Sequence, residues 1–428
     1  MPNLQVRPVR LAPGHEVPVL VSDGVQVYET SWWLVDQLLP SLRGSAPNTM
    51  AAKMRSVAHW LQWADYHKFN WATAVQSGKF MSSQTIGQVL KWMELEVDLS
   101  GSDRVKRLRV APRTAANRTG FLYQFLNWYS NRLVEAMPPS TYKGIVLEAY
   151  REWTSVWETK VRTAFPRSAP TRPPETMGEE QRELFLRVIR PGDPGNPWRK
   201  GLQVRNYALL MVLYEHGLRI SDVQQLRTDD LRLEKGLFTI AERIADPEET
   251  RRRRPNPKRR GHTVRTLRFT PESLEAMKLW LAERAQRDKW PGATRNAFVF
   301  VSHMAKTSKA LSTRRPGQLF QDLRKAYPEK RRKGGQVVNV GFNDDYFHPH
   351  ALRHDRAVRF VLDYYAKHGE WDLGGQEAMR KVFGWSLDSR QPAYYGGAAL
   401  LAIGVKAMVE LTDYRTQMGV AMEAEEEE

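Results

Sequence analysis

The first third of the chain carries apolar residues every three or four positions, which is the spacing of one face of an α-helix. Three such stripes stand out, over residues 48–63, 83–97 and 112–129. The first follows a potential helix cap at Asn48 and Thr49. This pattern predicts a helical domain over residues 28–161.

The segments on either side of that domain have little periodicity. Residues 1–27 are rich in Pro and Val and predict an extended N-terminal arm or a loose strand. Residues 162–175 contain four prolines with interspersed basic residues, which predicts an extended linker. We therefore expect a second domain over residues 176–420, followed by a glutamate-rich tail over residues 421–428.

The second domain mixes helical and strand patterns. Helices are expected over Glu179–Ile189 and Val204–His216, and Gly217 is placed to end the latter as a left-handed cap. A final helix is expected near Ala398–Thr416. Short strands are expected over residues 237–240, 264–269 and 297–301. The chain is thus predicted to be mainly α, with a small antiparallel β-sheet in a mixed α/β second domain.

The charge of the chain favours a polyanionic partner. The formal net charge is +17, although the last eight residues contain five Glu and no base. Such a balance is typical of nucleic-acid-binding proteins, and the alternative is a basic surface kept for solubility. The aromatic residues of the first domain favour a core over platforms for stacking on bases. Basic flanks beside these helices suit a module that grips phosphates.

Cysteine is absent, which excludes disulfides, cysteine–zinc sites and thiol nucleophiles. No apolar segment approaches the 18 or so residues that a membrane span needs, and the N-terminus lacks a secretory apolar core. We expect a cytoplasmic protein, associated with the nucleoid if the source is bacterial.

A very basic loop lies between two of the expected strands. Residues 251–260 read RRRRPNPKRR, with seven basic residues in ten. Such a loop could lie along DNA phosphates or project into a groove, and the alternative is a solvated loop.

Two short motifs place arginine next to polar partners. In HGLRISD, Arg219 follows a helix end and a glycine, and Asp222 could orient it from the next helix. In HPHALRH, a helix starting near Pro349 would put His350 and Arg353 on one face. A fixed guanidinium beside an imidazole suits a phosphodiester, since Arg stabilises its charge and His can move a proton. The alternatives are surface arginines and a capping histidine.

A third motif supplies a candidate nucleophile. Phe383-Gly384-Trp385 is followed nine residues later by Tyr394, which is next to Tyr395. We expect Tyr394 on an exposed stretch, because proline precedes it and two glycines follow, and nearby positive charge should lower its pKa. The alternative is a structural tyrosine. No metal is expected, because no acidic residue completes a zinc-binding HExxH pattern around the histidines.

Taken in order, GLRISD, HALRH and FGW followed by Tyr resemble the boxes of the tyrosine recombinase (phage integrase) family. The resemblance extends to residues 47–64 and 111–134, which look like the helical core-binding domain of that family. It implies a core-binding domain and a catalytic domain that form a clamp around DNA. It also implies cleavage and rejoining of DNA strands without a cofactor.

The resemblance implies a role for each matching residue. Arg219 and Arg353 would hold the scissile phosphate, His350 would act as general acid/base, and Trp385 would donate its indole N–H. Tyr394 would attack phosphorus, and Asp222 and His354 would support the site. Lys258, rather than Arg260, would protonate the leaving oxygen. The basic residues expected to bind DNA are Arg113, Arg118, Arg251, Arg252, Arg253, Arg254, Arg259 and Arg260.

The resemblance also implies an assembly of four protomers on two DNA duplexes, with accessory proteins as a further option. The helix after Tyr394 would dock on a neighbouring protomer or pack on its own domain. The main hypothesis is a site-specific recombinase of mobile DNA. Its rivals are an enzyme of the same chemistry, a type IB topoisomerase or telomere resolvase, and a DNA-binding regulator without catalysis. A covalent protein–DNA adduct would separate the last of these from the others.

Overall fold

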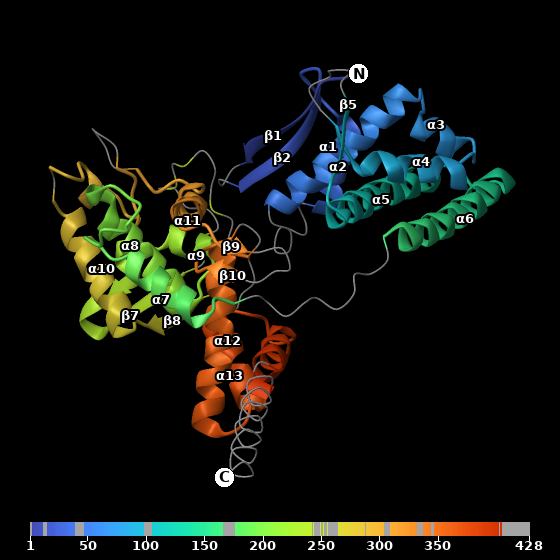
Figure 1. Ribbon diagram of the computed structural model, residues 1–428. Coiled ribbons are helices and arrows are strands. Elements are labelled where there is room, and N and C mark those ends of the chain that lie inside the picture. Colours follow the sequence, from blue (N-terminus) through green and yellow to red (C-terminus); the bar gives the residue numbers. More distant parts are fainter. Residues whose placement is uncertain are drawn as a thin grey trace, which may run out of the picture. The chain divides into compact units, whose positions relative to one another are not determined.

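The computed structural model divides the chain into two compact units, Met1–Thr171 and Arg172–Glu428 (Figure 1). The division falls inside the segment predicted as a linker. None of the described helices is both long enough and apolar enough to cross a membrane. The structure describes residues 2–11, 15–38, 47–97, 105–165, 176–241, 243, 249, 251, 255, 264–286, 288–303, 309–331, 337–343, 346–401 and 403–404.

Unit one is helical, as predicted, and its core is rich in tryptophan. Trp60, Trp71 and Trp153 come from three different helices, and their rings lie 5.1 to 6.5 Å apart in tilted or edge-on pairs. The aromatic residues therefore form a core, as expected. The helices are α1 (Tyr28–Trp33), the π-helix η1 (Leu34–Leu38), α2 (Pro47–Tyr66), α3 (Trp71–Gln76), α4 (Ser83–Met93), α5 (Pro112–Glu135) and α6 (Thr141–Ala164).

The end of the second predicted helix is a strand. Helix α4 stops at Met93, and β4 (Leu95–Val97) then pairs antiparallel with β5 (Val105–Arg109). The Arg118 side chain of α5 donates to the carbonyl oxygens of Met93 and Leu95, at 3.4 and 2.8 Å. The first of these bonds satisfies an acceptor at the end of α4, and the second ties α5 to the start of β4.

The predicted N-terminal arm is an ordered part of unit one. Strands β1 (Leu4–Leu11) and β2 (His15–Ser22) pair antiparallel, and β3 (Val25–Gln26) continues the sheet. Leu4, Val17 and Leu20 are buried in the same core as the helices. The alternating burial of a half-covered sheet explains why no helical period was visible here.

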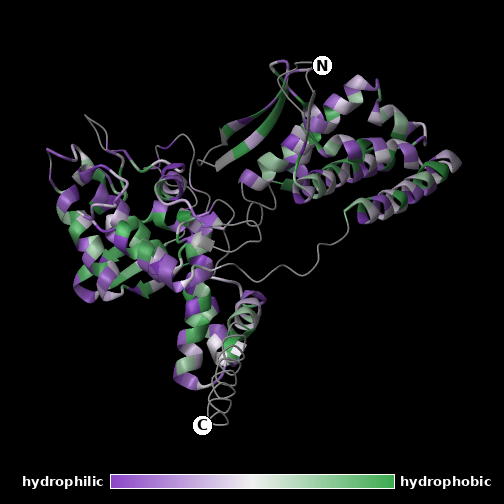
Figure 2. Ribbon diagram, viewed as in Figure 1, coloured by the Kyte–Doolittle hydropathy of each residue, from purple (hydrophilic) through white to green (hydrophobic). Residues whose placement is uncertain are grey.

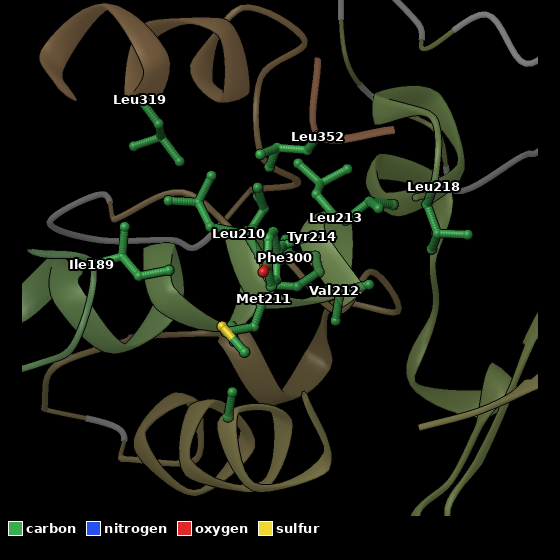
Figure 3. Close-up of a cluster of buried hydrophobic side chains, with 14 of the residues drawn as sticks. Ile189, Leu210, Met211, Val212, Leu213, Tyr214, Leu218, Phe300, Leu319 and Leu352 are labelled. Atoms are coloured by element: carbon green, nitrogen blue, oxygen red, sulfur yellow. The ribbon is translucent and has the colours of Figure 1, made fainter. Parts of the chain in front are cut away.

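Unit two is built around α8 (Lys200–His216). Seven consecutive residues of this helix, Ala208–Tyr214, are buried, so it is surrounded on all sides. Figure 3 shows Leu210 and Leu213 of this helix near Leu319 and Leu352, which come from two later helices. Figure 2 colours hydrophobic residues green, and such residues occur along the helices of this core. Around α8 lie α7 (Glu179–Val188), α9 (Ile220–Gln225), α10 (Pro271–Arg284), α11 (Arg315–Ala326) and α12 (Pro349–His368).

The small antiparallel sheet of unit two is present as predicted. Its order is β6 (Leu231–Arg232), β7 (Leu237–Ile240) and β8 (Arg265–Arg268). The prediction of a third strand over residues 297–301 was wrong. That buried run makes only isolated bridges, because it packs as a core segment under α10. The remaining short elements are η3 (Thr228–Asp230), η4 (Leu233–Lys235), η5 (Ala293–Arg295), β9 (Lys330–Arg331) and β10 (Val337–Asn339).

A smaller apolar cluster closes the C-terminal side of unit two. It joins α12, α13 (Leu373–Phe383) and a helical segment over residues 391–401 (Figure 1). The final helix predicted near Ala398–Thr416 thus starts earlier than expected. Its residues 402 and 405–416 lie outside the described part of the chain.

Replacing a leucine of α8 should cost unit two much of its stability. Leu210→Ala is expected to lower the free energy of unfolding by about 2 to 5 kcal/mol, because it leaves a cavity in a packed core. Leu279→Ala is the matched control, since Leu279 is 47% exposed, and a change within about 0.5 kcal/mol is expected. Urea unfolding followed by pulse proteolysis, scored on fragments of unit two, measures both. Equal losses would contradict the described core.

Candidate active site

A left-handed glycine fixes the end of α8 next to the candidate site. Gly217 has φ +56°, which ends the helix and turns the chain into α9. A Cβ atom on this glycine would lie 2.8 Å from the Phe383 ring and 3.1 Å from Arg356 Cβ. Only glycine therefore allows α8 to approach α12 and α13 this closely. Arg219 follows at the N-terminus of α9 and is half-buried.

The Arg353 side chain ties the motifs together. It is buried, and its guanidinium donates to the carbonyl oxygens of Gly217 and Phe383, at 2.6 and 2.7 Å. The same group lies over the rings of Phe383 and Trp385, at 5.0 and 5.2 Å from their centroids. Three motifs that are far apart in the sequence meet at this one side chain.

The surroundings of Arg353 are strongly cationic. Burial, and then the charge of Arg219, lowers the pKa of Arg353 to about 9, so the group stays charged at neutral pH. Among the described residues, Arg219 and Arg265 act on it as cations, whereas Asp222 is the carboxylate that acts in the opposite sense. A buried site with excess positive charge favours an anion such as a phosphodiester.

His350 lies on the same face of α12 as Arg353, as predicted from the motif. The helix begins at Pro349, and the His348 ring caps it by accepting from the Ala351 N–H at 3.2 Å. His350 keeps an exposed edge, but partial loss of water and then the charges of His354 and Arg353 lower its pKa to about 4. It is neutral at pH 7 and can accept a proton.

Asp222 has a different partner from the one expected. Its backbone N–H donates to the Arg219 carbonyl, as in any helix start, but its buried carboxylate accepts from Arg265 at 3.4 Å. Arg265 also donates to the Val382 carbonyl at 2.9 Å, and a Cβ on Gly384 would touch its guanidinium. Sequence reasoning did not select Arg265, because a basic residue in a short strand among many others carries no signal.

The two neighbouring tyrosines differ in burial. They lie on the helical segment 391–401, whereas an exposed stretch was expected. Tyr395 is 1% exposed, and its ring stacks on Trp385 at 5.6 Å with an interplanar angle of 6°. Tyr394 is half-buried against the Tyr395 ring, and burial raises its pKa. The expected lowering of that pKa by nearby charge is therefore wrong for the free protein.

Two of the arginines predicted to bind DNA make hydrogen bonds within the fold. Arg251 is 8% exposed and pairs with Glu249, and it donates to the carbonyls of Gln224 and Leu311 at 3.1 and 3.0 Å. Arg118 caps the end of α4, as described above. Arg113, in contrast, is exposed at the start of α5. Outside the described residues lie Arg252, Arg253, Arg254, Lys258, Arg259 and Arg260.

Within the described ranges, no three histidines or carboxylates are grouped so that they could hold a metal ion.

Residues 179–363 match the model of the phage integrase family. The chain is 33% identical over 150 residues to the type 1 fimbriae regulatory protein FimE of Escherichia coli K12, which covers 35% of this chain and 58% of that protein. It is 25% identical over 215 residues to the tyrosine recombinase XerA of Pyrococcus furiosus, covering 50% of this chain and 57% of the relative. The matched part of this chain thus spans less than two thirds of the length of either relative.

Among solved structures, the Tn1549 transposon integrase in complex with circular intermediate DNA is 16% identical, with a TM-score of 0.39, and the match covers 79% of this chain and 94% of that one. Residues 179–363, from α7 into α12, therefore carry a domain that matches the phage integrase family, and the relatives named above include a tyrosine recombinase.

His216, the first residue of the HGLRISD motif, should make unit two sensitive to acid. The His216 ring packs edge-on against Phe238 and Phe269 and shares a hydrogen bond with the Ser273 hydroxyl at 3.0 Å, and burial lowers its pKa to about 3. The unfolded chain binds this proton more readily. The stability is therefore present above pH 6.5 and is lost as the pH falls from there towards 3.

From pH 7 to pH 5, His216 alone should cost about 2 kcal/mol of unfolding free energy. His216→Phe removes the titration, so the stability of this variant relative to wild type should rise by that amount over the same interval. Pulse proteolysis of unit two in urea at both pH values measures the difference. Parallel pH profiles of the two proteins would show that His216 is not the group responsible.

Proposed function

We propose that this protein is a site-specific DNA recombinase that cleaves and rejoins DNA strands through a 3′-phosphotyrosine intermediate, as in the integration or excision of mobile DNA. The observation that carries the proposal is the junction at Arg353, which brings Arg219, His350 and Trp385 into one cationic site beside a tyrosine-bearing helix. The match of residues 179–363 to the phage integrase family supports it.

The cationic part of the site suits the transition state of phosphoryl transfer. Arg219 and Arg353 would bind the non-bridging oxygens of the scissile phosphate, and the Trp385 indole would donate a further hydrogen bond. Arg353 is already held by two carbonyl oxygens, so little reorganisation is needed when charge develops on the five-coordinate phosphorus.

The proposed exchange of phosphate ester bonds needs neither water nor ATP. The Tyr394 oxygen attacks phosphorus while the bond from phosphorus to the 5′ oxygen breaks, and the tyrosine proton passes to neutral His350. A bound phosphate would offset the neighbouring cations and raise the pKa of His350 from its free value of about 4. Lys258, which lies outside the described residues, would protonate the 5′ oxygen. Attack by a 5′ hydroxyl on the phosphotyrosine reverses the step.

Burial favours Tyr394 over its neighbour as the nucleophile. The Tyr395 hydroxyl is hydrogen-bonded to His354, so attack by this oxygen would first break that bond. Tyr394 lies at the edge of the same cluster and is partly exposed. The Asp222–Arg265 pair would hold the backbone near Val382 in place beside the site, and His354 would support His350.

The substrate would be double-stranded DNA in the cytoplasm, gripped by both units as a clamp. Four protomers on two duplexes would exchange strands, with accessory proteins as an option, and the segment that follows the nucleophile helix would contact a neighbouring protomer. Exchange between duplexes distinguishes this function from topoisomerase or resolvase activity.

Tyr394→Phe should abolish covalent attachment to DNA. The full chain is incubated with a duplex library that has a randomised central segment, and complexes that survive denaturant are isolated and sequenced. Wild type should yield adducts at a selected site, and peptide mapping should find the nucleotide on Tyr394. The variant should yield none, because phenylalanine has no attacking oxygen.

The absence of any wild-type adduct would leave only a regulatory role. Adducts that persist in Tyr394→Phe but vanish in Tyr395→Phe would shift the nucleophile by one residue. Exchange between two labelled duplexes carrying the selected site should also occur. Relaxation of a supercoiled plasmid without such exchange would indicate the topoisomerase alternative.

Substituting Arg113 should weaken DNA binding, whereas substituting Arg251 should affect the stability of the fold. Arg113→Ala should weaken binding to the selected duplex and reduce the salt dependence of the affinity by about one unit of slope, since an exposed phosphate contact is lost. Arg251→Ala should leave the slope of the folded protein unchanged. It should instead lower the free energy of unfolding by about 3 to 5 kcal/mol, because Glu249 becomes a buried, unpaired charge.

Binding titrations at several salt concentrations, together with urea unfolding, separate the two effects. A reduced slope in Arg251→Ala would restore this residue to the DNA interface.

A further inference from the structure

A buried hydrogen bond connects the nucleophile helix to α12. The Tyr395 hydroxyl and His354 Nδ1 are 2.5 Å apart, and the Tyr395 ring is held flat against Trp385. His354 follows His350 by one helical turn, and the two imidazole rings meet edge to face with centroids 4.6 Å apart. A continuous series of contacts thus runs from the helix that carries Tyr394 to the candidate general base.

The inward face of the nucleophile helix is narrow and closely packed. The buried positions within residues 391–401 are Pro392, Tyr395, Gly396 and Ala399, which share one side of a helix. A Cβ on Gly396 would lie 2.3 Å from Nε1 of Trp371, in the segment before α13. Tyr394 is outside this face. The fit therefore holds the backbone of the helix close to Trp371 and leaves Tyr394 at the rim.

The direction of the hydrogen bond follows from the two groups. Burial raises the pKa of Tyr395 to about 12, and burial is also the main cause that lowers the pKa of His354 to about 4. The phenol therefore keeps its proton and donates it to Nδ1, which places the imidazole proton of His354 on Nε2. One tautomer and one ring orientation of His354 are selected while the helix is seated.

We infer that Tyr395 is a positioning residue for DNA cleavage: its hydroxyl, acting through His354, orients His350 at the same time as it seats the helix that carries Tyr394. The inference rests on the proposed function. The base and the nucleophile become competent together, because a protomer whose helix is displaced loses the partner that fixes His354. The phenol makes no contact with the phosphate in this role.

The experiment uses the duplex selected above, with a nick beside the mapped cleavage position so that rejoining is prevented. Single-turnover adduct formation and DNA affinity are measured for wild type, Tyr395→Phe, His354→Phe and the double variant. Each single variant should slow adduct formation about tenfold, as expected for the loss of one buried hydrogen bond. Affinity should stay within about twofold, and the adduct should remain on Tyr394.

The double variant is the decisive measurement. If Tyr395 acts through His354, the double variant should also be about tenfold slow, because the second change removes nothing further. A loss of about a hundredfold would show independent effects and overturn the inference. Parallel losses of affinity and melting temperature would reduce Tyr395 to a packing role, and would also overturn it.

Glycine variants give a second measurement with a matched control. Gly396→Ala should slow adduct formation because the new methyl group pushes the helix away from Trp371. Gly397→Ala, one residue along the same helix, has open space around it and should behave as wild type. Equal rates for both alanine variants would contradict a seated helix.

The two proposals fail in different ways. A wild-type protein that forms no adduct overturns the proposed function. An adduct that forms in wild type but maps to Tyr395 overturns the positioning role alone, because the buried tyrosine would then be the nucleophile.

Discussion

The site depends on one buried cation. The Arg353 guanidinium donates to the carbonyls of Gly217 and Phe383, and so fastens the end of α8 and the end of α13 to α12. Gly217 and Gly384 both take the left-handed conformation, and each lets another group approach closer than a side chain would allow. Without the arginine, two carbonyl oxygens in the interior would lose their donors. The geometry of the first and third motifs is therefore set by a residue of the second.

Burying this cation is costly, and the cost has a functional consequence. Arg219 and Arg265 lie in the electrostatic field of Arg353, and Asp222 offsets only part of their charge. The aromatic faces of Phe383 and Trp385 lessen the cost without neutralising it. An anion bound here would relieve the repulsion, so part of its affinity would arise from the repulsion already present in the free site. A neutral site of the same shape would lack this preference.

Periodicity and motif spacing predicted much of this arrangement, because both depend on local sequence. The helices α2, α5 and α8, the glycine cap at Gly217 and the helix start at Pro349 were all visible in this way. What failed depends on contacts between distant residues. The run 297–301 has strand composition but packs beneath α10, and Arg251 belongs to a basic run yet pairs with a buried glutamate. Basic residues look alike in a sequence, and only the fold separates exposed ones from buried ones.

The pair of tyrosines shows the same limit at one position. Motif spacing selects Tyr394 and is silent about Tyr395, whereas the fold encloses Tyr395 and joins it to His354. The site then has two parts of different character. Arg353 is locked into the core, but the nucleophile helix is held by a narrow face of small and aromatic residues. Because the fixed part retains its charge when the helix is displaced, a protomer could grip a phosphate without being able to cut it. Cleavage would then be controlled at the seating of the helix, and the hydrogen bond to His354 makes that seating the condition for an oriented base.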